Sequence, residues 1–444
     1  MTIFRGTFLD TPQDPFLGGL LRAQQDGGVL VTDGVIVERD SYEALRLRHR
    51  DEEVVDLSGG LVLPGFVDTH VHFPQVRMIG ALGMPLLNWL ELRALPEEAR
   101  LADIDYARQI ATEFVGGLVA AGTTTALVFG AHFASAVDAL FTEADKVGLR
   151  VTSGLVVSDR ILRPDLLTPA ATAYDEGRAL AERWHGVRRN RFAVIPRFSL
   201  SCTESLLDSC AALLGDVQGA WFTTHVNENV AEIATVSKLF DGCDDYLATY
   251  HRHGLVTSRG VFAHNVHASP GELDLLAGQG AAVAHCPTSN SALGSGLFPL
   301  REHVDHGVRV AIGSDVGAGT GFSLFKEGLQ AYFMQQLLGE RGLPLTPAHL
   351  LHLTTSAGAA ALGMGDQVGD FEAGKQFDAL WLRPVAGSTL DVCLRHAEGA
   401  EDALAKAFAL GTPADVESTW VAGRRVTVEA RTLSRSGTLS GIRK

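Results

Sequence analysis

Five residues with metal-binding side chains each lie at the end of an apolar run. The run LVLPGFVDTHVH ends in His70 and His72, WFTTHVNE contains His225, VFAHNVH contains His264 and VRVAIGSDV contains Asp315. Imidazole and carboxylate groups drawn from distant segments suit a catalytic divalent cation. If the apolar runs are parallel strands of one barrel, their carboxyl ends meet at one face and can share a single site. The pattern therefore indicates a metal-dependent hydrolase.

The pair His70 and His72 has the spacing H-x-H. On a strand, residues i and i+2 point to the same side, so both imidazoles can bind one ion from a single strand end. A lone H-x-H also occurs in ordinary turns. The surrounding PGFVDTHVH, with Pro64, Gly65 and Asp68, makes the pattern much more specific.

His225 supplies a third imidazole, and Asp315 supplies a carboxylate after the apolar run VRVAI. A carboxylate at that position is costly to bury without a cation or hydrogen bonds, although a helix N-cap is the structural alternative. We expect these two residues and the H-x-H pair to hold the ion. Asp315 would also help to remove a proton from a bound water.

Glu228 follows His225 by three positions, where the chain turns into a helix. A carboxylate in the first turn of a helix is favoured by the helix dipole, which is the structural explanation for this residue. Beside a metal-bound water, the same carboxyl would be a general acid and base. We expect Glu228 to carry protons in catalysis.

His264 is either a ligand of a second metal or a partner that orients the water in a one-metal site. Binuclear sites in such barrels usually need a bridging carboxylate or modified lysine on the fourth strand. The fourth strand, RFAVIPRFSL, has no lysine and no acid. We therefore expect one cation, zinc with iron as the alternative, and a catalytic role for His264.

The segments that must position these residues alternate between strand-like and helix-like patterns. Eight apolar strand runs, from LVLPGFVDTHVH to VRVAIGSDV, are separated by helical segments that often end in glycine. This count predicts an α/β fold with a (β/α)₈ TIM-type barrel over residues 64–367. Strand-rich segments 1–63 and 368–430 predict a small β-sandwich domain formed by both termini, and 431–444 a C-terminal tail.

Composition limits the classes of protein to which the chain can belong. The 444 residues carry a formal net charge of −15, which argues against nucleic-acid or anionic-membrane binding. The five cysteines form no CxxC pair, so a disulfide framework is not expected. No apolar stretch approaches the ~18 residues that cross a bilayer. We expect a soluble cytoplasmic protein.

Several longer motifs identify a resemblance to a known family. They are HVHFPQ, LLNWLELRALPEE, PRFSLSC, THVNEN, and the segment from HCPTSN to GSDVGAGTGFSLFKE. The chain resembles the amidohydrolase superfamily and, within it, the guanine deaminase family, over most of its length. That resemblance implies hydrolytic deamination of the free base guanine to xanthine and ammonia, and it implies a homodimer.

The resemblance also implies substrate-binding residues. Residues that match Gln75, Arg197 and Phe198 contact the purine in that family. Arginine supplies paired donors for the O6 and N7 acceptors of guanine, and glutamine can donate and accept. Trp89 or Phe198 could stack on the flat ring. The alternatives are another aminohydrolase of the same fold, with a cytosine, adenosine-type or triazine substrate, and a non-catalytic scaffold.

Overall fold

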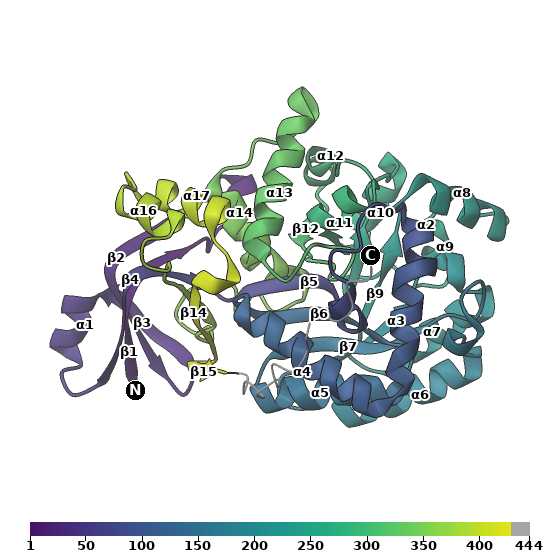
Figure 1. Cartoon of the computed structure of the whole chain (residues 1–444), viewed down its shortest axis with the longest axis horizontal. Coiled ribbons are helices and arrows are strands. Elements are labelled where there is room, and N and C mark those ends of the chain that lie inside the picture. Colours follow the sequence, from purple (N-terminus) through teal and green to yellow (C-terminus); the bar gives the residue numbers. More distant parts are fainter. Residues whose placement is uncertain (428–444) are drawn as a thin grey trace, which may run out of the picture.

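The computed structural model describes residues 1–427, which form a barrel packed against a sheet built from both ends of the chain (Figure 1). The barrel contains one parallel sheet of eight strands in sequential order. Its strands are β5 (Phe66–His72), β6 (Thr123–Ala131), β7 (Arg150–Val157), β8 (Asn190–Pro196), β9 (Trp221–Val226), β10 (Gly260–His264), β11 (Ala282–His285) and β12 (Arg309–Ile312). The predicted eight-stranded barrel is confirmed.

Helices surround the barrel strands and connect one strand to the next. Those before β9 are α2 (Leu86–Trp89), α3 (Leu95–Ala99), α4 (Ile104–Ala120), α5 (Ala134–Val147), α6 (Ala170–Trp184) and α7 (Glu204–Asp216). Those after it are α8 (Val230–Leu239), α9 (Ala248–His251), α10 (Pro270–Gln279), α11 (Pro287–Ala292), α12 (Leu300–Asp305), α13 (Leu324–Leu337), α14 (Pro347–Thr354) and α15 (Ser356–Ala361).

Local sequence explains where these helices begin and end. Helix α10 begins with a capping box, in which Ser269 and Glu272 each bond to the other's backbone N–H. It ends at Gly280, whose φ of 65° lies in the left-handed region that glycine tolerates. Asp103 caps the start of helix α4, where its side chain accepts a hydrogen bond from the amide of Asp105.

The barrel closes where its last strand meets its first. The amide of Asp315 donates to the carbonyl of His70 at 2.8 Å, and the amide of His72 donates to the carbonyl of Val316 at 3.0 Å. The hydroxyl of Thr69 donates to the carbonyl of Ile312 at 2.9 Å. The loop after β12 is therefore tied to the histidine pair on β5.

The terminal segments form one mixed sheet of seven strands, in the order β15-β14-β13-β4-β1-β2-β3. Its strands are β1 (Thr2–Asp10), β2 (Arg22–Thr32), β3 (Val35–Ser41), β4 (Glu53–Pro64), β13 (Ala379–Leu382), β14 (Val416–Val421) and β15 (Arg424–Val426). Helices α1 (Tyr42–Arg48), α16 (Thr389–Arg395) and α17 (Ala400–Leu410) accompany it. The prediction that both termini build one small sheet domain is confirmed.

The two ends of this sheet fold toward each other around an aromatic core. Phe4 on β1 stacks on Phe377 at 4.1 Å between ring centroids and meets Trp420 of β14 at 6.0 Å. The amide of Phe377 donates to the carbonyl of Gly34 in the turn between β2 and β3. The sheet therefore encloses its own apolar layer, as a sandwich does.

The division into domains at residues 63/64 and 367/368 stays a prediction. In the structure β4 ends at Pro64 and β5 begins at Phe66, so the chain passes directly from one sheet to the other. The tail predicted for 431–444 lies outside the described residues.

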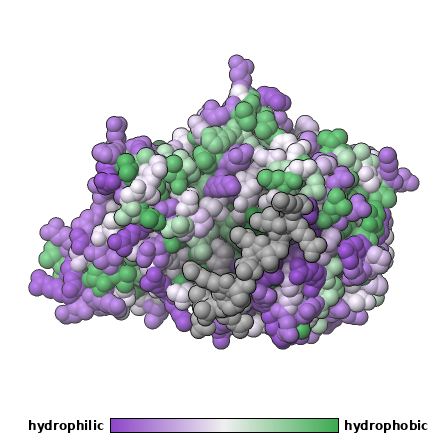
Figure 2. All heavy atoms as spheres, in the orientation of Figure 1, coloured by the Kyte–Doolittle hydropathy of each residue, from purple (hydrophilic) through white to green (hydrophobic). Residues whose placement is uncertain are grey.

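The surface carries mostly polar residues. Figure 2 shows hydrophilic residues across the face drawn there, with apolar residues gathered in small patches. Among residues 1–427, no helix has the length and apolar character that crossing a membrane requires. The expected homodimer and cytoplasmic location stay predictions.

A buried ion pair joins the barrel to the terminal sheet. Arg150, the first residue of β7, donates from Nε and Nη2 to the two carboxylate oxygens of Asp378 at 3.1 and 3.0 Å. Asp378 also accepts from the amide of Ala422 at 2.8 Å, and its carbonyl accepts from the amide of Gly65 at 3.0 Å. Asp378 therefore links the first barrel strands to both halves of the terminal sheet.

Replacing Asp378 with alanine should lower the free energy of unfolding by about 3–5 kcal/mol, because the Arg150 guanidinium would remain buried without its carboxylate. Urea denaturation followed by circular dichroism measures this change. The matched variant Asp51→Ala removes an exposed carboxylate and should change stability by less than about 0.5 kcal/mol. Equal denaturation midpoints for the two variants would show that the ion pair between Arg150 and Asp378 does not stabilise the contact between the barrel and the terminal sheet.

Candidate active site

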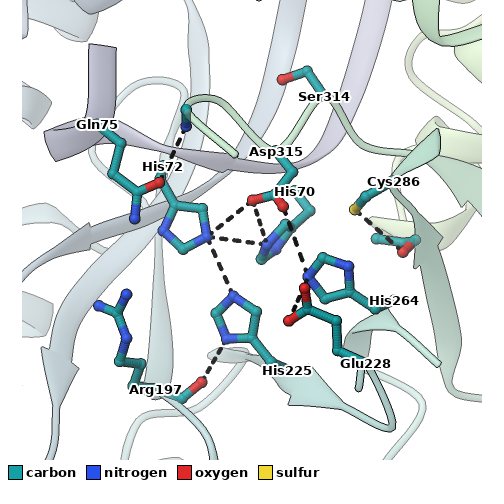
Figure 3. Close-up of polar contacts among 12 residues, drawn as sticks. His70, His72, Gln75, Arg197, His225, Glu228, His264, Cys286, Ser314 and Asp315 are labelled. Carbon is teal, nitrogen blue, oxygen red and sulfur yellow. Dashed lines mark hydrogen bonds and ion pairs between the residues drawn. The ribbon is translucent and has the colours of Figure 1, made fainter. Parts of the chain in front are cut away.

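Three imidazoles and one carboxylate converge at the carboxyl end of the barrel (Figure 3). The Nε2 atom of His72 lies 3.2 Å from Nε2 of His70 and 3.2 Å from Nε2 of His225. Oδ1 of Asp315 lies 3.3 Å from Nε2 of His70 and 3.2 Å from Nε2 of His72. All four side chains are buried. The structure therefore brings together the four residues predicted to hold a metal.

The spacing of these atoms fits a single cation. In a tetrahedral zinc site with bonds of ~2.0–2.1 Å, neighbouring ligand atoms are about 3.4 Å apart. Hydrogen bonding cannot account for the cluster, because Nε2 of His72 faces two other nitrogens and a carboxylate while carrying at most one proton. A cation at the common point would accept a lone pair from each atom. The donor set therefore fits one divalent metal ion.

A contact behind His225 fixes the orientation of its imidazole. Nδ1 of His225 lies 2.6 Å from the backbone carbonyl of Arg197. A carbonyl only accepts, so Nδ1 carries the proton and Nε2 presents its lone pair to the cluster. The backbone after β8 thus selects the tautomer of a ligand on β9.

Asp68 holds the first strand against the loop that carries Asp315. Its Oδ1 accepts from the amides of Ser314 at 3.0 Å and His70 at 3.2 Å, and its Oδ2 accepts from the hydroxyl of Ser314 at 2.5 Å. Burial raises the pKa of the Asp68 carboxyl to about 7 despite these hydrogen bonds. The acid in the PGFVDTHVH motif therefore positions ligands and does not itself face the cluster.

Backbone strain gathers at the same strand ends. His264 at the end of β10 and Asn265 after it have φ values of 71° and 48°, and Asn227 and Asp315 both have 49°. Residues other than glycine occupy this left-handed region at a cost of ~1–3 kcal/mol each. Such strain persists where surrounding contacts over-determine the backbone. Here it aims the side chains of His264 and Asp315 toward the interior of the barrel mouth.

His264 lies beside the cluster. Its Nε2 is 3.6 Å from Oε2 of Glu228 and 3.8 Å from Oδ2 of Asp315, which is longer than the separations within the cluster. Its Nδ1 is 3.0 Å from Oδ1 of Asn290, which holds the ring in place. Ser295 donates its hydroxyl to Oε1 of Glu228 at 3.4 Å. A small molecule in the cavity would meet Glu228 and His264 together.

Burial perturbs the titration of these groups. Burial, and then the charge of Asp315, raise the pKa of Glu228 well above its usual value, so this carboxyl holds a proton readily. Burial lowers the pKa of His225 well below its usual value and that of His72 to about 4. The histidines are therefore neutral, the form that binds metals. Burial alone would raise the pKa of Asp315, but the adjacent His70 and His72 lower it well below the usual value.

A cavity of about 340 Å³ opens beside the cluster. All of the residues predicted to bind substrate or to act in catalysis border this cavity: Gln75, Trp89, Arg197, Phe198, Glu228, His264 and Asp315. The ligand-type residues His72 and His225 border it as well. His70 is fully buried behind them.

The polar wall of the cavity is organised by a buried carboxylate, Glu98. Arg197 donates from Nη1 to Oε2 of Glu98 at 2.5 Å, and Gln75 donates from Nε2 to Oε1 of Glu98 at 2.7 Å. Oε1 of Gln75 accepts from the amide of Gly317 at 3.1 Å. Burial opposes ionisation of Glu98, but the charge of Arg197 outweighs it and holds the pKa of the carboxyl far below its usual value. The arginine and the glutamine therefore have fixed orientations toward the cavity.

Sequence reasoning missed Glu98 as a member of the site. In LRALPEEA the glutamate follows a proline and another acid, which is the composition of a helix first turn. His132, whose Nε2 lies 3.5 Å from Glu98, was also not predicted. The motif LLNWLELRALPEE was the one sequence signal that included Glu98.

His285, whose role the sequence left open, does not border the cavity. It is fully buried and stacks on Phe298 at 4.2 Å between ring centroids. The next residue, Cys286, lies close to His70, His264 and Asp315. Each of these four residues has one possible ligand atom, and the four atoms all lie within 4.8 Å of one another. A thiol to which the sequence analysis assigned no role therefore lies next to the ligand-type residues.

The sequence of this chain is similar to those of known proteins. Residues 61–426 match the model of the amidohydrolase family. A curated relative from Deinococcus radiodurans, described as a probable guanine deaminase, is 60% identical over 429 residues, which cover 95% of this chain and 98% of the relative.

Solved structures agree with the sequence comparison. The guanine deaminase of Escherichia coli superposes with a TM-score of 0.93 at 36% identity, covering 96% of this chain and 99% of that one. A guanine deaminase from C. acetobutylicum with guanine bound in its active site gives a TM-score of 0.89 at 26% identity, covering 96% of this chain and 100% of that one. The chain therefore belongs to the amidohydrolase family and, within it, to the guanine deaminases.

Proposed function

We propose that this protein hydrolyses guanine to xanthine and ammonia with the help of one zinc ion, iron being the alternative metal. The observation that carries the proposal is a single cavity with two functional sides. One side presents a cluster of ligand atoms spaced for a cation, with Glu228 beside it, and the other presents Arg197 and Gln75. The relatives described above are named for the same activity.

His70, His72, His225 and Asp315 would hold the ion. A divalent cation bound there would supply the acidity that lets a water lose a proton near neutral pH. One ion suffices, because β8 carries no lysine or acid that could bridge a second.

Three residues would act on the water and on the base. His264, fixed by Asn290 and 3.8 Å from Oδ2 of Asp315, would orient the water together with that oxygen and take its proton. Glu228 moves a proton to N3 of guanine, which makes C2 more electrophilic. Addition of water at C2 and protonation of the amino group then release ammonia. The raised pKa of Glu228 suits a group that must both hold and give up a proton.

The purine is held by the opposite wall. Arg197 offers donors that its pairing with Glu98 leaves available, and these match the acceptors O6 and N7 of guanine. Gln75 can donate from its second amide hydrogen. Trp89 and Phe198 line the cavity and supply apolar surface for the flat ring.

Replacing Glu228 with glutamine should lower kcat for guanine by ~10²–10⁴-fold, because the amide keeps the shape of the side chain but cannot carry the proton. Conversion of guanine to xanthine, followed by absorbance, measures this loss. Metal content should stay at about one ion per chain, and the exposed-site variant Glu417→Gln should retain full activity. A kcat close to that of the wild type would reject the proton-transfer role.

Replacing His72 with alanine should remove both metal and activity. The loss of one donor should weaken binding of the ion by more than the ~10–100-fold that changes to outer contacts cause. Elemental analysis of protein purified without chelators measures bound zinc and iron. The variant His396→Ala, which removes an exposed histidine, should keep its metal. Full metal occupancy in the His72 variant would contradict the proposed ligand set.

Replacing Glu98 with glutamine should raise KM for guanine by roughly 10- to 100-fold, because Arg197 would lose a charge-assisted hydrogen bond and its fixed orientation. The change in kcat should be smaller, and metal content should not change. The neighbouring variant Glu97→Gln alters a carboxylate that pairs with Arg100 near the surface and should behave as wild type.

A panel of bases tests the substrate assignment. Ammonia release from guanine should exceed release from cytosine, adenosine or aminotriazines by orders of magnitude in kcat/KM. Preference for one of those compounds would replace guanine as the substrate while leaving the metal-dependent chemistry intact.

A further inference from the structure

A strongly basic hollow lies at the end of the barrel opposite to the candidate active site. Four arginines line it, Arg150, Arg188, Arg189 and Arg191, and among residues 1–427 no aspartate or glutamate borders it. The hollow has a volume of about 980 Å³. The chain as a whole has a net charge of −15, so this local concentration of positive charge has the sign opposite to that of the whole molecule.

Strand pairing assembles this cluster. Arg150 and Asn190 are the first residues of β7 and β8, and Thr152 of β7 pairs with Arg191 of β8. The substrate-binding Arg197 follows the other end of β8, seven residues after Asn190 and therefore roughly 20 Å away. The hollow is thus separate from the cavity that holds the metal ligands. Conserved chemistry of barrel enzymes is confined to the carboxyl end, so this hollow would bind a ligand without transforming it.

The positive charges in the hollow are only partly neutralised. Arg150 pairs with Asp378, and Arg188 lies 3.2 Å from Asp145. Among residues 1–427, Arg189 and Arg191 have no carboxylate within ion-pair distance.

Arg191 has only neutral partners among the described residues. Its Nε donates to the hydroxyl of Thr152 at 3.1 Å and its Nη1 to the carbonyl of Leu362 at 2.9 Å. Its Nη2 is buried without any partner among residues 1–427. Burial, and then the charge of Arg150, lower the pKa of Arg191 to about 10, which is the expected result of holding a guanidinium without a counter-charge.

Asn190 provides a second, independent observation. Its side chain is 1% exposed and borders the hollow, yet its amide nitrogen and its amide oxygen both lack a hydrogen-bond partner among the described residues. Leaving buried polar atoms unpaired costs ~1–3 kcal/mol each. These atoms and Nη2 of Arg191 are enclosed, so a polar ligand in the hollow would satisfy them once the two side chains turn toward it.

We propose that this hollow is a binding site for a phosphate-bearing anion with two or more linked phosphate groups. Guanidinium groups bind phosphate oxygens through paired, charge-assisted hydrogen bonds. Two arginines without carboxylates, supported by two that are paired, supply positive charge for more than a single phosphate. The amide of Asn190 adds a donor for one further oxygen. The proposal is independent of the substrate of the active site.

Titration of the metal-loaded protein with inorganic pyrophosphate tests the proposal. The Arg191 guanidinium lies 4.9 Å above the ring of Trp221, so binding should change tryptophan emission, and this change should vanish in Trp221→Phe. Calorimetry at constant ionic strength gives the affinity. Sodium chloride added to the same ionic strength should give no saturable signal, because simple screening has no binding stoichiometry. Metal content measured before and after titration excludes removal of the active-site ion by pyrophosphate.

Variants distinguish a built site from general attraction of anions. Arg189→Gln should raise the Kd for pyrophosphate at least tenfold while kcat for guanine stays unchanged. Arg108→Gln removes the same charge from the exposed surface of α4 and should leave the Kd within twofold. A parallel titration with a nucleoside diphosphate identifies the source of the phosphates, since equal affinity assigns recognition to the phosphates and tighter binding adds contacts to the nucleoside. Absence of saturable binding of both probes, or equal Kd values for wild type and Arg189→Gln, would overturn the proposal.

Discussion

The remainder of the structure depends on holding three imidazole nitrogens and a carboxylate oxygen at one point away from water. These atoms lie 3.2–3.3 Å from their neighbours in the cluster and present lone pairs to one another. Without a positive charge among them, such an arrangement is repulsive and loses the hydration of a buried carboxylate. A cation reverses the sign of the interaction. The protein must therefore supply, from contacts elsewhere, the rigidity that keeps the ligands in place.

Closure of the barrel provides much of that rigidity. His70 and His72 belong to the first barrel strand and Asp315 follows the last, so they become neighbours only because the sheet curls back on itself. Asp68 accepts from both the amide and the hydroxyl of Ser314, and the amide of Asp315 donates to the carbonyl of His70. The same contacts that complete the barrel therefore set the distances within the ligand cluster.

Arg197 connects this cluster to the cavity wall that we propose faces the purine. Its carbonyl fixes the tautomer of His225, while its guanidinium pairs with Glu98, which in turn orients Gln75. A displacement of the residue after β8 would disturb a proposed metal ligand and the proposed substrate wall together. Glu98 also balances the charge of the arginine, so the cavity can accept a neutral base without leaving an uncompensated buried cation. The arrangement is consistent with an uncharged, planar substrate.

Local patterns in the sequence predicted the features that depend only on neighbouring residues in the chain. Apolar runs identified the eight strands, and the histidines and the aspartate at the ends of some of them identified the ligand-type residues, because strand burial and side-chain alternation are local properties. Glu98 carries no such signal, since PEE is equally suited to the exposed first turn of a helix, and its importance arises only when Arg197 lies opposite it. The basic hollow is likewise formed by residues that only the folding of the chain brings together. Arg188, Arg189 and Arg191 are close in sequence, but Arg150 joins them through the pairing of β7 with β8. The lack of a carboxylate from residues 1–427 beside Arg191 depends on which segments pack there. Partners across the barrel are decided by register and packing, so a site made of such partners becomes visible only when the strands are placed in space.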